Sequence, residues 1–127
     1  MNGREKLEGY LISLGYSFEK LGDDTWLINE PAKGLLNVMI LLDSPVVMIR
    51  VNVMNTPELK KEEFLTDVLR LNATDVIHGA YALDGDKLIL IDTLLIETLD
   101  KEELQSTLDA FSLALFQHFS KLSVYRN

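Results

Sequence analysis

Residues 36–53, LNVMILLDSPVVMIRVNV, decide the fold of this chain. Two apolar runs, Leu36 to Leu42 and Val46 to Val53, flank Asp43-Ser44-Pro45, whose residue types are typical of a tight turn. The stretch therefore predicts two antiparallel strands joined by a hairpin turn.

The two faces of this predicted hairpin differ in composition, because successive side chains of a strand point to opposite faces. One face carries only apolar, mostly β-branched side chains, which we expect to meet helices: Val38, Ile40, Leu42, Val47, Ile49, Val51 and Val53. The other face mixes apolar and polar side chains: Asn37, Met39, Leu41, Asp43, Val46, Met48, Arg50, Asn52 and Met54.

We expect the mixed face to be covered, because an antiparallel sheet with one face in water usually alternates cleanly between apolar and polar residues. Either the last helix or an N-terminal segment of the same chain covers it, or a partner protein does. Flexible, polarizable methionine side chains suit a surface that accommodates a partner. We therefore predict that Met39, Leu41, Met48 and Arg50 contact a protein partner.

Before the hairpin, the sequence predicts one helix and two short strands. Apolar residues recur at helical spacing from Arg4 to Leu14, and Gly15 is placed to end that helix. Strands are expected over residues 16–20 and 25–29, with a turn at Gly22-Asp23-Asp24 between them.

After the hairpin, two helices flank a second hairpin. Thr56-Pro57 predicts a helix start, and Asn72 is expected to end this helix in a left-handed conformation. Strands are predicted over residues 78–83 and 87–91, around the turn Asp84-Gly85-Asp86. Asp100 opens the last helix, where Glu103 completes a capping box and an apolar stripe continues through Leu122.

The element order is helix, three or four strands, helix, two strands, helix. Strands joined by tight turns imply a mainly antiparallel sheet with helices on one face, which is a two-layer α+β fold. No linker or repeat interrupts the 127 residues, so we expect a single domain over residues 1–127.

Composition excludes several classes of protein. The chain has no cysteine, which excludes disulfides, thiolate zinc sites and cysteine nucleophiles. Its net charge of −8 repels phosphate backbones and anionic lipid, so we expect no nucleic-acid or membrane partner. The second half, residues 61–127, is the more acidic and favours a basic partner segment. With no signal peptide or spanning segment, we expect a cytoplasmic protein.

The residues give no positive support for catalysis, a cofactor or a metal site. His78 and His118 have no metal-ligand spacing, and His118 falls on an apolar helical stripe typical of a core or edge residue. Gly-x-Ser-x-Gly and glycine-rich phosphate motifs are absent from the sequence. The alternative hypothesis is a small-ligand-binding or enzymatic domain, with Trp26 and Tyr81 lining a pocket between sheet and helices.

From about Leu36 to Leu122 the chain resembles the YbjN family and the wider type III secretion chaperone-like fold (CesT-like). Four short motifs carry the resemblance: Leu69-Arg70-Leu71-Asn72, Ala80-Tyr81-Ala82-Leu83-Asp84, Lys87-Leu88-Ile89-Leu90, and Leu99-Asp100 with Glu103-Leu104. The resemblance implies a non-enzymatic, acidic cytoplasmic protein, chaperone-like or regulatory and often a homodimer. Such secretion chaperones hold an extended segment of a partner protein, while the cap residues Asn72 and Asp100 transfer as structural residues only.

Overall fold

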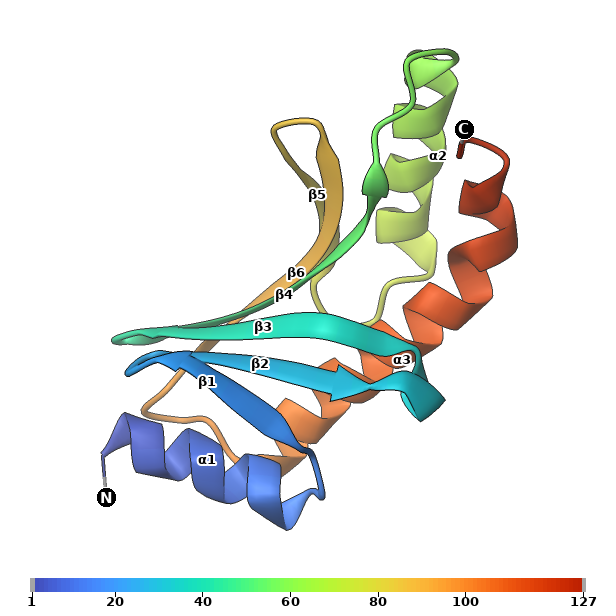
Figure 1. The fold of residues 1–127 in the computed structure, drawn as a ribbon. Coiled ribbons are helices and arrows are strands. Elements are labelled where there is room, and N and C mark those ends of the chain that lie inside the picture. Colours follow the sequence, from blue (N-terminus) through green and yellow to red (C-terminus); the bar gives the residue numbers. More distant parts are fainter. Residues whose placement is uncertain (1, 127) are drawn as a thin grey trace.

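The computed structural model describes residues 2–126, which form three α-helices, six β-strands and one short 3-10 helix (Figure 1). In chain order they are α1 (Gly3–Ser13), β1 (Phe18–Gly22), β2 (Thr25–Glu30), the 3-10 helix (Pro31–Lys33), β3 (Leu35–Asp43), β4 (Val46–Asn55), α2 (Lys61–Thr74), β5 (Ala80–Asp84), β6 (Lys87–Leu95) and α3 (Lys101–Ser123). This confirms the predicted α+β class and its element order, with four strands ahead of α2.

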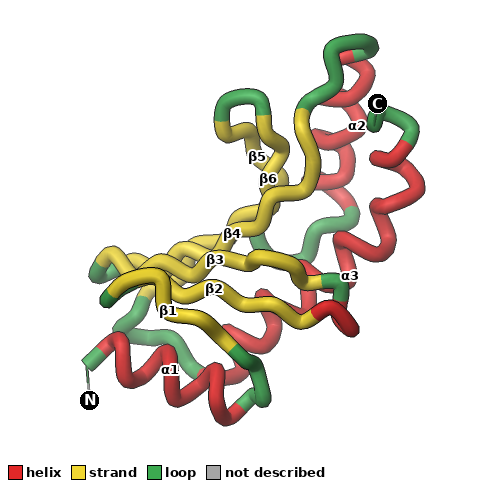
Figure 2. The backbone as a smooth tube through the Cα atoms, viewed as in Figure 1, coloured by secondary structure: helices red, strands yellow, loops and turns green. Residues whose placement is uncertain are grey.

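The six strands form one sheet in the order β1-β2-β3-β4-β6-β5, and every neighbouring pair is antiparallel. The sheet is strongly twisted, and all three helices lie on one side of it (Figures 1 and 2). The chain therefore forms two layers, one of strands and one of helices. None of the helices in residues 2–126 is long and apolar enough to cross a membrane.

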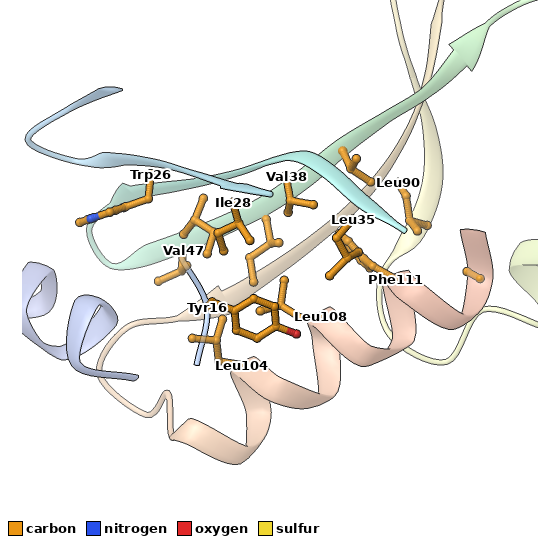
Figure 3. Close-up of a cluster of buried hydrophobic side chains, with 14 of the residues drawn as sticks. Tyr16, Trp26, Ile28, Leu35, Val38, Val47, Leu90, Leu104, Leu108 and Phe111 are labelled. Atoms are coloured by element: carbon orange, nitrogen blue, oxygen red, sulfur yellow. The ribbon is translucent and has the colours of Figure 1, made fainter. Parts of the chain in front are cut away.

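The core lies between the helices and the predicted apolar face of the sheet. Val38, Ile40, Val47 and Ile49 are fully buried there, as their alternation predicted. Helix α3 supplies the opposing layer through side chains such as Phe111 (Figure 3). Burial of each such side chain contributes about 1.5–3 kcal/mol of hydrophobic free energy.

Two predicted helix ends are confirmed. Gly15, which follows the C-cap residue Leu14 of α1, has a φ of +84°, a conformation that glycine adopts without steric cost. At the start of α3, the Glu103 backbone N–H donates to Asp100 Oδ1 at 2.7 Å, and the Asp100 N–H donates to Glu103 Oε1 at 3.3 Å. This capping box satisfies two backbone donors that the helix itself leaves free.

The predicted start of α2 at Thr56-Pro57 is wrong, since the helix begins at Lys61. The Thr56 N–H donates to the carbonyl of Asp86 at 2.7 Å, which keeps the chain beside the β5–β6 hairpin beyond the end of β4. Pro57 is buried, and Lys60 has a φ of +60° immediately before the helix. A tertiary hydrogen bond thus outweighs the local capping signal.

The predicted end of α2 at Asn72 is also wrong, because the helix continues to Thr74. Asn72 stays helical and turns its side-chain amide toward β5, where Oδ1 accepts from the Tyr81 N–H at 2.7 Å. Its Nδ2 donates to the Tyr81 carbonyl at 3.1 Å. Asn72 therefore joins α2 to an edge strand.

Two predicted strands begin later than expected. His78 lies in the loop ahead of β5, which starts at Ala80 after Gly79 with a φ of +79°. Tyr16 precedes β1 and is buried in the core. In both places the chain must first turn toward the sheet before it can pair.

Candidate protein-binding surfaces

The sheet brings the four predicted contact residues together on its second face. Met39 is directly opposite Arg50, and Leu41 is directly opposite Met48 in the β3–β4 pairing. All four side chains are half-buried. Their position on one face follows from the two-residue period of the strands, so this part of the prediction needed only the correct register.

Within residues 2–126 no helix covers this second face, which we call the open face. Of the two alternatives for its cover, the last helix or an N-terminal segment is not the one found in these residues, because α1 and α3 pack on the other side of the sheet (Figures 1 and 2). In the middle of the open face, half-buried apolar side chains come from four adjacent strands: Leu27, Met39, Leu41, Met48 and Ile91. They form an apolar strip across the middle of the sheet.

One end of the open face is polar. Arg50 Nη2 donates to Asp84 Oδ2 at 2.9 Å, an ion pair that links β4 to the β5–β6 hairpin. Exposed ion pairs of this kind contribute little to stability, about 0–1 kcal/mol. Its structural effect is to hold the Arg50 side chain beside Asn37 and Asn52 at the edge of the apolar strip.

A second surface lies on the helix side of the sheet, and sequence reasoning missed it. An apolar groove of about 500 Å³ runs between the C-terminal half of α3 and strands β3 and β4. Its lining residues are mainly aromatic and aliphatic: Leu36, Val51, Val53, Tyr81, Leu115, Phe116, Phe119 and Leu122, with Gly34, Asn52 and Arg126. We call this surface the α3 groove.

The α3 groove matches only half of the predicted pocket between sheet and helices. Tyr81 lines it, as expected, whereas Trp26 is fully buried in the core and its Nε1 donates to Glu8 Oε1 at 2.9 Å. Phe116 and Phe119 were missed because the predicted helical stripe took in only the side chains that meet the core. The signal was the width of the apolar stripe on α3, which extends beyond the core-facing positions.

His118 lies beside this groove, in a buried polar cluster that joins α2, β5 and α3. Only 1% of His118 is exposed, and its Nδ1 is 2.7 Å from the Tyr81 hydroxyl. Its Nε2 has no hydrogen-bond partner and is 3.5 Å from Asp75 Oδ2. The neighbouring carboxylate favours the tautomer with hydrogen on Nε2, so that Tyr81 donates to Nδ1.

Burial sets the ionisation of this cluster. It lowers the pKa of His118, although the nearby Asp75 carboxylate acts in the opposite direction. Burial also raises the pKa of Tyr81 to about 12. Both side chains are therefore neutral at pH 7, and His118 is the core histidine that its position on the apolar stripe indicated.

Three further titratable side chains, those of Asp92, His78 and Glu97, have structural partners or are exposed. Asp92 accepts from the Thr93 N–H at 3.0 Å and from the Thr107 hydroxyl at 2.9 Å, which joins β6 to α3. His78 and Glu97 are exposed. Among the described residues, no three histidine or carboxylate side chains are grouped to hold a metal ion. Asp92, His78 and Glu97 do not line the α3 groove.

Comparison with models of known protein families identifies one family that matches the whole chain. The model of the family described as CesT_Tir_1 matches residues 1–127. No curated protein sequence matches the chain.

Solved structures share the fold at low sequence identity. YbjN from E. coli aligns with a TM-score of 0.72 and 16% identity, covering 92% of this chain and 91% of that one. An uncharacterized protein from Methanothermobacter thermautotrophicus aligns with a TM-score of 0.69 and 16% identity, covering 96% and 97%. The Yersinia pestis type III secretion chaperone SycH, solved in complex with a fragment of YscM2, aligns with a TM-score of 0.55 and 16% identity, covering 91% and 98%.

Proposed function

Because the chain belongs to the CesT_Tir_1 family, we propose that it is a non-enzymatic protein-binding module of chaperone-like or regulatory type. The fold it shares with SycH, which was solved with a bound protein fragment, supports a protein partner. A cytoplasmic setting and self-association into a homodimer are part of the same proposal.

The open face is the main structural support for this proposal. An apolar strip across four strands is half-exposed on the side of the sheet that no helix covers. Met39 and Met48 lie on neighbouring strands within it, and flexible thioether side chains adapt to the shape of a partner. A bound segment would remove this apolar area from water, at about 25 cal/mol per Å².

The test replaces the two methionines together. The Met39→Asp/Met48→Asp variant places two carboxylates in the strip and should reduce capture of the native partner by at least about tenfold, as loss of a central anchor does. Tagged wild type and variant are compared by affinity capture and mass spectrometry, with far-ultraviolet circular dichroism to verify folding. A folded variant that still captures the same protein would show that the open face is not the contact surface.

A matched control separates charge from loss of apolar area. Asn37→Asp/Thr93→Asp adds the same two charges on the same face, at exposed positions that carry no apolar side chain. This control should retain the partner. Equal loss in both variants would mean that added negative charge, and not the methionine contacts, prevents binding.

A further inference from the structure

The α3 groove has the size of a small-molecule site. Its volume of about 500 Å³ falls within the range of roughly 300–1,000 Å³ that such sites occupy. On the sheet side, Leu36, Val51 and Val53 line it beyond the paired segments of β3 and β4, which are Met39–Asp43 and Val46–Arg50. Aliphatic side chains therefore form this wall of the groove.

Helix α3 supplies the opposite wall. Phe116, Phe119 and Leu122 line the groove at helical spacing, and Arg126 follows four residues later. The ring of Phe116 packs on Gly34, where an added Cβ would lie 3.0 Å from Phe116 Cζ. Phe116 and Phe119 are nevertheless each 60% exposed. The two rings thus present apolar area that a ligand would remove from water, which is favourable.

Tyr81 adds an aromatic side chain to the groove without adding a polar anchor. Only 4% of Tyr81 is exposed, and its hydroxyl lies 2.7 Å from His118 Nδ1. The hydroxyl hydrogen is therefore already donated, to an imidazole that is neutral at pH 7. A polar group on a ligand must find its partner elsewhere in the groove.

That partner is Arg126, which alone among the described lining residues is charged. Its guanidinium carbon is 5.5 Å from the centre of the Phe119 ring, and its Nη2 donates to the Val53 carbonyl at 3.4 Å. Within residues 2–126, no carboxylate forms an ion pair with it. Residues 110–126 also contain no acidic side chain. The guanidinium therefore keeps donors for an anion, at the edge of an apolar groove.

We propose that the α3 groove binds a free long-chain fatty acid. The hydrocarbon tail lies against Phe116 and Phe119, and the carboxylate accepts hydrogen bonds from the Arg126 guanidinium. The planar fork of a guanidinium matches a carboxylate in charge and geometry. A tail without polar atoms leaves no hydrogen-bonding group unpaired against the apolar lining. This ligand-binding activity goes beyond the proposed protein-binding function and uses a different surface from the open face.

The probe is radiolabelled dodecanoate, used below its micellar concentration in equilibrium dialysis against the full chain. Octanoate and decanoate should bind more weakly, by about fourfold for each methylene removed, because the tail is buried. Labelled dodecyltrimethylammonium has the same tail and a cationic head. It should bind at least about tenfold more weakly than dodecanoate, since Arg126 repels it. The net charge of −8 on the chain would favour the cation if binding were non-specific.

Variants of Arg126 test the carboxylate site. Arg126→Gln should weaken dodecanoate binding by at least about tenfold, because the carboxylate then faces the negative C-terminal end of the α3 dipole without a cation. Arg126→Lys retains the charge and should lose less. Lys121→Gln is the matched control, since Lys121 is an exposed cation of the same helix that does not line the groove. It should bind dodecanoate as wild type does.

Variants of the aromatic wall test the tail site. Phe116→Gln/Phe119→Gln should also weaken binding by at least about tenfold, because it removes both rings from the groove. Leu113→Gln is the matched control, an exposed apolar position of α3 outside the groove. Far-ultraviolet circular dichroism verifies folding of each variant. If the double variant does not fold, Arg126→Gln at an exposed position still decides the question.

Four results would overturn the proposal. They are no bound dodecanoate at about 1 mM, equal binding of dodecyltrimethylammonium, and unchanged binding by a folded variant of either Arg126→Gln or Phe116→Gln/Phe119→Gln. Loss of native-partner capture in the aromatic variant, with no dodecanoate bound by wild type, would assign the groove to the partner protein. In that case this inference fails while the proposed protein-binding function stands.

Discussion

At the scale of single residues, His118 makes the stability of the protein depend on pH. Its pKa in the folded protein lies below the ordinary value of 6.5, because burial penalises the imidazolium. The unfolded chain therefore binds a proton more readily, and the free energy of unfolding should fall as pH decreases below about 6.5 until the folded-state pKa is reached. The slope approaches at most about 1.4 kcal/mol per pH unit.

Urea unfolding between pH 7.5 and 5.5 measures this slope. His118→Gln should flatten it whatever the variant does to absolute stability, because glutamine does not titrate in this range. His78→Gln, at an exposed loop position, is the matched replacement of the other histidine. A His118→Gln slope equal to that of wild type would assign the acid sensitivity to other groups.

At the scale of elements, the Asn72 side chain fastens edge strand β5 to α2. Asn72→Ala leaves the Tyr81 N–H and carbonyl without their partners at 2.7 and 3.1 Å in a partly buried place. We expect a loss of about 1–3 kcal/mol in the free energy of unfolding, the cost of unsatisfied buried polar groups. Urea unfolding should show this loss in Asn72→Ala and less than about 0.5 kcal/mol in Arg70→Ala, an exposed position of the same helix. Equal stability of the two variants would mean that water replaces the amide.

The same elements show how far the sequence predicts the structure. Alternation along the paired residues 39–43 and 46–50 assigned those side chains to their faces, and the capping box at Asp100 located the start of α3, because both signals are local. The Thr56-Pro57 signal failed because a hydrogen bond to Asp86, thirty residues away in the chain, competes with it. The wide apolar stripe on α3 was a signal for Phe116 and Phe119, but the groove itself could not be predicted, since it forms where β3 and β4 diverge beside α3.

At the scale of the whole molecule, the open face is large enough to hold two copies of the chain together. With strands about 4.8 Å apart and about 17–34 Å long, the sheet presents on the order of 700 Å², not far below the roughly 800 Å² per partner of a stable interface. The apolar strip of one copy packs against the same strip of a second copy as readily as against another protein. We therefore expect a homodimer in the absence of a partner.

Light scattering across a dilution series measures this association. At high concentration the mass should be about twice the 14.4 kDa of one chain, and dilution should lower both the mass and the thermal midpoint, because only the folded chain dimerises. Met39→Asp/Met48→Asp should be monomeric throughout, whereas Asn37→Asp/Thr93→Asp should associate as wild type does. A dimer that persists in the methionine variant would place the contact elsewhere and leave the open face free for the partner. A mass of 14.4 kDa at every concentration would contradict self-association. The apolar strip would then be accessible to a partner protein on a monomeric chain.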